Sequence, residues 1–288
     1  MNKIYEEVTD QIIAMLEQGQ IPWRKPWAGT EAGAISYNTG KPYSLLNQIL
    51  LQVPGEYITF NQCKEKGGSV KKGAKGKRVY FWKLYRKTET ETDENGNEVE
   101  VTKTIPVLKS FTVFNIEDCE GITPKWQDKL PEVPAQPIEE AERVLTDYVT
   151  REGITLENQL ISGKAYYSPA FDKIVTPRID QFESSAEYYS TAFHEAVHST
   201  GHPKRLNRLT TGKSAAFGGE DYSKEELCAE IGSACILHRM GIDTPESFRN
   251  SAAYVQGWLR ALKDDKQLII GAASRAEKAV AYIMNEEV

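Results

Sequence analysis

Residues 184–202 read SSAEYYSTAFHEAVHSTGH, and the rest of the chain is organised around this stretch. Ser184 and Glu187 form an S-x-x-E capping box, which is a common start of an α-helix. Apolar side chains then recur every three or four residues, as they do on the buried face of a helix. Gly201 and Pro203 are typical of the end of a helix. The stretch therefore predicts a single helix.

This predicted helix carries an H-E-x-x-H motif, formed by His194, Glu195 and His198. Residues four apart lie one turn above each other, so both imidazoles face the same side and can converge on a divalent metal ion. Glu195 then reaches the open side of the site, where it can accept a proton from water. Isolated matches without a metal do occur, but a chance match is rare in a chain with four histidines. The motif predicts a catalytic metal site.

A catalytic zinc site needs a third protein ligand. The best candidates are Glu226 and Glu230, which are four residues apart in the next predicted helix, YSKEELCAEIGSACIL. We expect Glu226 to bind the metal and Glu230 to hydrogen-bond a ligand histidine, with the reverse assignment as the alternative. Ser223 lies three residues before Glu226, so a plain capping box is the competing interpretation. For Glu225, the competing interpretation is a solvated acid in the first helical turn.

Two residues near the expected site, His202 and Tyr222, are candidates for contacts with a substrate or with a transition-state oxyanion. His202 follows Gly201, where helical register is lost, so it is a weaker candidate for a metal ligand. The metzincin pattern would place a histidine at position 204, which is Lys204 in this chain. Nitrogen and oxygen ligands favour Zn²⁺, although Mn²⁺ or another divalent metal would fit the same donor set.

Composition and length indicate a cytoplasmic protein of two domains. The start, MNKIYEEVTD, is acidic and lacks the apolar segment of a signal peptide. No apolar run approaches the roughly 20 residues of a membrane span, so we expect no membrane partner. The four cysteines are scattered without a C-x-x-C pair, which indicates small core residues in a reducing compartment.

The order of the predicted elements indicates an α+β protein with two parts. Residues 1–120 read as a helix followed by several antiparallel strands, in a small α+β domain. Residues 121–137 are rich in proline and charge, which is typical of an interdomain linker. Residues 138–288 read as a helix, short strands and then the H-E-x-x-H helix, an order that resembles zincin metallopeptidases.

The first part also holds a basic and aromatic patch. Between positions 64 and 87 there are ten basic residues and one acid, Glu65. Lysine and arginine neutralise phosphates, and exposed rings stack on unpaired bases, so the patch suits single-stranded nucleic acid. The candidate contacts are Trp23, Arg24, Lys25, Trp27, Lys71, Lys72, Lys75, Lys77, Arg78, Tyr80 and Trp82. The competing interpretation is a solvated loop before a strand that buries one of its ring faces. For Trp23 and Trp27, the alternative is a core anchor at the edge of the domain.

Longer stretches show a family resemblance. In the first half they are VTDQIIAMLEQGQIPWRKPW, GKPYSLLN, GGSVKKGAKGKRVYFW and FTVFN; in the second they are HEAVHSTGHPKRLNR, FGGEDYSKEELCAEIG and AAYVQGWLRAL. Over nearly its whole length the chain resembles the ArdC-type antirestriction proteins of conjugative plasmids and related mobile elements. The resemblance implies an N-terminal domain that binds single-stranded DNA, a C-terminal zincin-like metallopeptidase domain, and protection of incoming DNA from restriction. An acidic hairpin at 89–100 departs from the pattern, and its charge could shield the basic patch.

Three functions follow as hypotheses. The first is an antirestriction protein that binds single-stranded DNA and has a working gluzincin-like peptidase. In the second, protection comes from occluding the DNA, and the metal site is structural or inactive. The third is a plain cytoplasmic metallopeptidase. The sequence does not identify a protein substrate.

Overall fold

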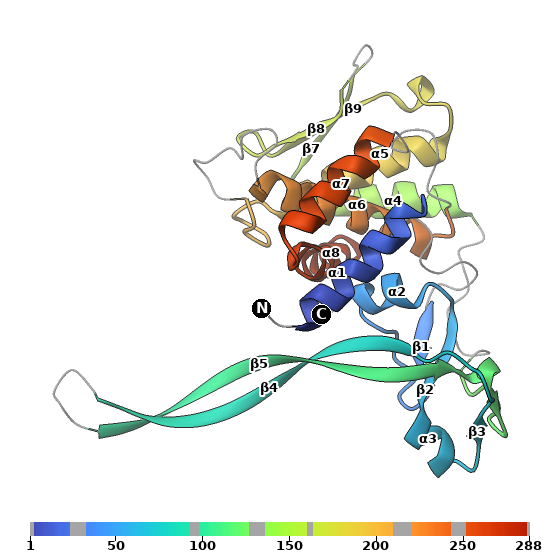
Figure 1. Ribbon diagram of the computed structural model, residues 1–288. Helices are drawn as coiled ribbons and strands as arrows, with labels where there is room; N and C mark the ends of the chain where they lie inside the picture. Colours follow the sequence, from blue (N-terminus) through green and yellow to red (C-terminus); the bar gives the residue numbers. More distant parts are fainter. Residues whose placement is uncertain are drawn as a thin grey trace.

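The computed structural model describes residues 3–23, 33–92, 98–126, 136–159, 164–209, 220–242 and 252–286. It contains helices and strands in separate layers, so the predicted α+β fold class is confirmed. Figure 1 shows the central helices between two sheets, one built by the first part of the chain and one by the second.

The first sheet has the order β1-β2-β5-β4. Its strands are β1 (Ala34–Ser36), β2 (Gly55–Thr59), β4 (Lys77–Thr92) and β5 (Glu98–Asn115). The short helices α2 (Leu45–Leu51) and α3 (Phe60–Glu65) connect these strands, and β3 (Ser69–Val70) pairs with β6 (Cys119–Glu120) beside them. β1 and β2 are parallel, and the remaining neighbours in the first sheet are antiparallel.

The hairpin formed by β4 and β5 is far longer than the sheet to which it belongs. Its ladder runs from Lys77↔Val113 to Thr92↔Glu98, whereas β2 pairs only with the last three residues of β5. Most of the hairpin therefore extends from the body as a two-stranded arm (Figure 1). We call this hairpin the arm. Residues 93–97, which join β4 to β5, lie outside the described residues.

The second sheet has the order β7-β9-β8, with β9 in the centre. Its strands are β7 (Thr155–Gln159), β8 (Tyr166–Ser168) and β9 (Lys173–Pro177). The helices around it are α4 (Pro137–Glu152), α5 (Ser185–Thr200), α6 (Glu220–Arg239), α7 (Ala252–Asp264) and α8 (Leu268–Met284). Strands β8 and β9 contact α5, the helix that carries the H-E-x-x-H motif.

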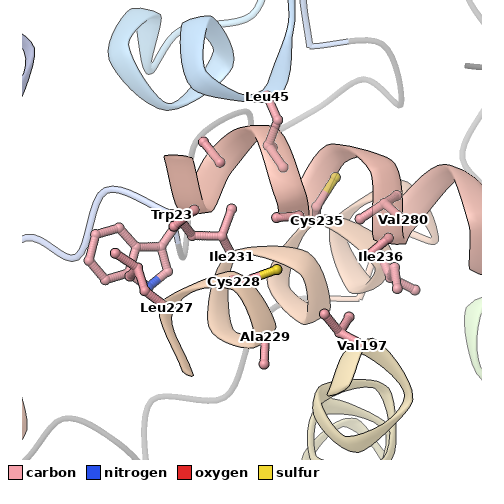
Figure 2. Packing of buried hydrophobic residues seen from close by; sticks show 14 of the residues in the cluster. Trp23, Leu45, Val197, Leu227, Cys228, Ala229, Ile231, Cys235, Ile236 and Val280 are labelled. Carbon is pink, nitrogen blue, oxygen red and sulfur yellow. The ribbon is translucent and has the colours of Figure 1, made fainter. Parts of the chain in front are cut away.

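The hydrophobic core continues from one part of the chain into the other. Apolar residues of α1 (Lys3–Glu17) lie in the same buried cluster as those of α6 and α8. Trp23 belongs to this cluster, and its ring meets Trp258 edge to face at 6.4 Å between centroids. Figure 2 shows its indole beside Leu227 of α6. The division into residues 1–120, 121–137 and 138–288 stays a prediction from sequence, and the core is not divided in the same way.

Polar contacts join the two parts as well. The hydroxyl of Thr9 donates to the carbonyl of Lys266 at 2.7 Å, and the first amide of α2, that of Leu45, donates to Glu277 of α8 at 3.2 Å. Cys228 and Cys235 lie buried in α6, as expected for small core residues. Among the described residues, no helix has both the length and the apolar character that crossing a bilayer requires.

Candidate metal centre

Helix α5 begins and ends where the sequence predicts. The hydroxyl of Ser184 accepts a hydrogen bond from the amide of Glu187 at 3.2 Å, and the helix ends at Thr200, before Gly201. Gly201 has a right-handed backbone, with φ of −73°. Its lack of a side chain matters for packing, because a Cβ there would come within 2.8 Å of Leu209 and 3.1 Å of the carbonyl of His198.

A second glycine lets the neighbouring helix approach α5. A Cβ on Gly232 of α6 would lie 2.9 Å from a methyl group of Val197, closer than such contacts are observed. The absence of that Cβ allows the two helices to lie close together at the H-E-x-x-H motif. The acidic residues of α6, Glu225, Glu226 and Glu230, are thereby brought beside the two histidines.

His194, His198 and Glu226 converge on one point. Their ligand atoms all lie within 4.8 Å of one another. The two Nε2 atoms are 3.1 Å apart, and oxygens of Glu226 lie 3.6 Å from Nε2 of His194 and 3.3 Å from Nε2 of His198. Ligands about 2.0–2.1 Å from a tetrahedral zinc ion would be separated by roughly 3.3–3.4 Å. The donor set and its spacing therefore fit a divalent metal ion.

The other ring nitrogen of each histidine faces a different glutamate. Nδ1 of His194 lies 3.5 Å from Glu230, and Nδ1 of His198 lies 3.6 Å from Glu225. Carboxylates in this position orient ligand histidines and favour the tautomer that binds metal. Glu230 thus faces the ring nitrogen of His194 that is turned away from Glu226. Glu225 is not the solvated acid of the competing interpretation, because its side chain is only 14% exposed.

Arg208, in the loop after α5, holds Glu225 in place. Its guanidinium donates two hydrogen bonds to the Glu225 carboxylate, at 2.8 and 3.2 Å. It also donates to the hydroxyl of Thr200 at 2.8 Å and to the carbonyl of Val197 at 2.9 Å. Arg208 thus ties the end of α5 to the first described turns of α6. Sequence reasoning identified neither Arg208 nor Gly232, since neither residue type binds metal.

The pKa values of His198, Glu225 and Glu226 are shifted because histidine and glutamate side chains of opposite charge lie close together. Burial by itself would lower the pKa of His198, but its contacts with Glu225 and Glu226 outweigh burial and raise the pKa to about 10. Burial would raise the pKa of Glu226, but the two histidines hold it well below its usual range. The pKa of Glu225 is likewise lowered, because His198 and Arg208 outweigh its burial. The opposite charges of the histidine and the glutamates therefore stabilise each other in this cluster.

Glu195 lies on α5 next to His194 and is 7% exposed. Its negative charge contributes to the raised pKa of His198. His202 lies beyond the end of α5, and its Nδ1 accepts a hydrogen bond from the amide of Lys204 at 3.2 Å. It does not join the ligand cluster formed by the described residues. Tyr222 lies within α6, but its side chain is outside the described residues.

Replacing Glu225 by glutamine is expected to weaken metal binding by about 10- to 100-fold, the usual effect of losing an outer carboxylate. Glutamine keeps the shape of the side chain but removes the charge that faces His198. Isothermal titration with Zn²⁺ or Mn²⁺ measures the effect. Glu139→Gln, at an exposed position of α4, is the matched control. Equal affinities for Glu225→Gln and the unchanged protein would contradict the role given to Glu225.

The structure corrects two of the predicted nucleic-acid contacts. Trp23 is 1% exposed and Tyr80 is 4% exposed, so neither presents a ring face on which a base could stack. Trp23 is covered by the core described above, and the backbone of Tyr80 is held against α2 by two hydrogen bonds of 2.8 Å with the side chain of Asn47. The sequence could not separate a buried ring from an exposed one at these positions.

The other residues predicted to contact nucleic acid differ in how exposed they are and in whether they are paired within the protein. Lys71, Lys72 and Lys75 are exposed, and Trp82 is 49% exposed. Lys77 is half-buried and donates to the carbonyl of Leu51, and Arg78 forms an ion pair with Glu7. Arg24, Lys25 and Trp27 lie outside the described residues.

Two family models match the chain. The N-terminal domain of anti-restriction factor ArdC matches residues 2–114, and a zincin-like metallopeptidase matches residues 141–275. The crystal structure of the antirestriction ArdC protein from plasmid R388, in its metal-free form, superposes with a TM-score of 0.72 at 36% identity. It covers 99% of both chains. The Mn(II)-bound form gives a TM-score of 0.72 at 35% identity, covering 98% of this chain and 97% of that one.

Relatives by sequence include larger proteins. The chain is 35% identical to a DNA primase TraC of Escherichia coli over 97% of its own length, but it spans only 27% of that primase. It spans 20% of a second TraC, also at 35% identity. The uncharacterized protein y4eC of Sinorhizobium fredii (strain NBRC 101917 / NGR234) is 30% identical, over 97% of this chain and 91% of that protein.

Proposed function

The chain belongs to the ArdC family of antirestriction proteins, and we propose that it binds single-stranded DNA and protects incoming DNA from restriction. We propose further that its zincin-like part is a metal-dependent peptidase that acts in the cytoplasm, on a protein substrate still to be identified. The observation that carries the enzymatic part is the convergence of two histidines of α5 and one glutamate of α6 within 4.8 Å.

In this proposal His194, His198 and Glu226 hold the metal, with Glu230 and Glu225 fixing the orientation of the two imidazoles. Zn²⁺ is the ion favoured by nitrogen and oxygen ligands, and the Mn(II)-bound form of the R388 protein supports a divalent metal in general. When bound, such an ion supplies Lewis-acid activation of water and of a peptide carbonyl.

The remaining chemistry is done by side chains of the protein. The carboxylate of Glu195 accepts a proton from the attacking water and later returns it to the nitrogen of the leaving amine. Its burial beside the ligand histidines keeps it close to the reacting atoms. His202 and Tyr222 are the proposed donors to the oxyanion, which needs hydrogen bonds as it develops charge.

The DNA-binding part of the proposal is supported by exposed positive charge near the arm. Lys71, Lys72 and Lys75 lie on the surface of the loop that leads into β4. Lysines in such a loop attract phosphates and make binding dependent on salt. Trp82 offers an exposed ring on the same strand.

Changing Lys71, Lys72 and Lys75 together to alanine is expected to weaken binding to a single-stranded oligonucleotide. The slope of log affinity against log salt should fall by about 0.7 for each phosphate that the variant no longer neutralises. Fluorescence anisotropy at several salt concentrations measures both quantities.

The matched control changes three exposed lysines of the second part of the chain, Lys204, Lys263 and Lys278. This control should keep both the affinity and the salt slope of the unchanged protein. An unchanged protein that does not bind single-stranded oligonucleotides would contradict the proposed DNA-binding function itself.

A further inference from the structure

The arm changes its charge along its length. Residues 77–87 and 103–113, the half nearer the sheet, carry seven basic side chains and no acidic one. Among the described residues of the outer half, 88–92 and 98–102, there are four acidic side chains and no basic one. Such a division is not needed to hold a hairpin together, because the ladder of backbone hydrogen bonds is the same in both halves. It indicates that the inner half meets an anionic partner.

The pairing of β4 with β5 collects lysines and rings on one face of the inner arm. Phe81 lies opposite Lys109, Tyr85 lies opposite Ile105, and Phe111 lies opposite Val79. Since alternate residues of a strand point to the same side, Lys83 shares this face with Phe81 and Tyr85. We call the set formed by Phe81, Lys83, Tyr85, Lys109 and Phe111 the lysine-aromatic face. All five side chains are exposed.

Lysines and rings alternate closely on this face. Nζ of Lys83 lies 5.6 Å from the centre of the Phe111 ring, and Nζ of Lys109 lies 5.0 Å from the centre of the Tyr85 ring. Each ammonium group therefore lies near the face of a ring rather than beside a carboxylate. A single strand of nucleic acid presents the complementary pair of groups, since each flat base is joined to a phosphate.

The rings at the base of this face are held by the body of the protein. The ring of Phe81 lies 5.9 Å from both Tyr43 and Phe111, and Tyr43 lies 6.2 Å from Tyr57. Tyr43 and Tyr57 are buried. The exposed rings thus continue a row of aromatic contacts that begins in the core. Because these rings are already held in place, they lose less conformational entropy when a ligand binds to them.

The opposite face of the arm is less suited to this partner. Near the sheet it is covered, because Tyr80 and Leu108 are buried in the core. Its arginine nearest the body, Arg78, is paired with Glu7. Farther out it presents Trp82, Leu84 and Arg86, so it has one exposed ring where the lysine-aromatic face has three.

We propose that the lysine-aromatic face is the surface on which single-stranded DNA lies, with Phe81, Tyr85 and Phe111 stacking on bases and Lys83 and Lys109 contacting phosphates. This inference rests on the proposed function, namely that the chain binds single-stranded DNA. The acidic outer half of the arm marks the end of this surface, because it repels the phosphates that the inner half attracts.

The test measures the binding of the full-length protein to a fluorescein-labelled oligonucleotide of about 16 nucleotides, the upper site size for a single-strand-binding fold. Tyr85→Ala and Phe111→Ala should each weaken binding by about 5- to 100-fold, the usual effect of losing one stacking ring. Lys83→Gln combined with Lys109→Gln should reduce the salt slope by about 0.7 for each phosphate that is left without its lysine.

Leu84→Ala, on the opposite face of the arm, and Phe171→Ala, an exposed ring in the turn between β8 and β9, are the matched controls and should bind as the unchanged protein does. The thermal unfolding midpoint of each variant shows whether it has folded. Normal affinity in folded Tyr85→Ala, Phe111→Ala and lysine variants would overturn the inference, while binding lost only on changing Lys71, Lys72 and Lys75 would leave the proposed function standing. An unchanged protein that fails to bind would overturn both.

Discussion

Glu195→Gln is expected to lower the rate of peptide hydrolysis by about 10²- to 10⁴-fold, the usual contribution of a general acid–base. The two side chains have nearly the same shape, so the packing around this buried position is preserved. Glutamine cannot accept a proton from water or return one to the leaving amine. Binding of metal and of single-stranded DNA should be unaffected, because the ligand set and the arm are unchanged.

The hydrolysis assay uses a mixture of fluorogenic peptides, since the natural substrate is not identified by the site. Glu139→Gln is the control for a glutamine substitution at an exposed position. A Glu195→Gln protein that hydrolyses peptides at the normal rate would contradict the role of Glu195.

The same variant separates two ways of protecting DNA. If Glu195→Gln still protects DNA from a restriction enzyme while peptide hydrolysis is lost, protection comes from occluding the DNA. If protection is lost together with hydrolysis, and metal and DNA still bind, protection requires the peptidase. Both measurements are made on one preparation, so differences in folding between preparations do not enter the comparison.

Glu226→Ala is expected to reduce metal affinity by more than the 10- to 100-fold that loss of an outer carboxylate costs. The other two proposed ligands, His194 and His198, lie on one helix, so they approach the site from one side. A metal present at about 1,000 times its dissociation constant stabilises the folded protein by about 4 kcal/mol. The unchanged protein should therefore unfold roughly 7 °C higher when the metal is added, and the variant should keep less than about a third of that shift.

The quantity to compare is the change in unfolding temperature when metal is added. The unfolding temperature alone is not enough, because removing Glu226 alters the charges around the two histidines even when no metal is bound. EDTA should cancel the shift in the unchanged protein and have little effect on the variant. Glu183→Ala, at an exposed position before α5, is the control and should keep the full shift. A normal shift in Glu226→Ala would mean that a different carboxylate binds the metal.

Local sequence rules account for part of the metal centre. The cap at Ser184, whose hydroxyl accepts from the amide of Glu187, and the four-residue spacing of His194 and His198 are properties of one helix, and a helix has the same geometry in every protein. The choice of α6 as the source of acidic groups also followed from ligand chemistry. The outer position of Glu225 could not be predicted in this way. Its role depends on Arg208, which approaches it from a separate loop.

For the arm as well, the sequence did not predict which side chains are buried and which are exposed. The alternation of side chains in residues 77–87 indicates two faces, but a strand has the same period whichever face is buried. The prediction placed Tyr80 and Trp82 on the DNA. Packing against α2 and the core covers Tyr80, whereas Trp82 stays exposed, as do Phe81 and Tyr85 on the other face of the arm.

The sequence by itself determined the two-part α+β organisation, the helix of the H-E-x-x-H motif and the family, because periodicity, capping and long ordered matches are local in the chain. Only the tertiary structure decided how residues far apart in sequence meet. The close approach at Gly232 brings glutamates of α6 to the histidines of α5, and the shared core buries Trp23 against Trp258. These contacts depend on which surfaces pack together to exclude water, and that packing involves residues from the whole chain rather than from one segment.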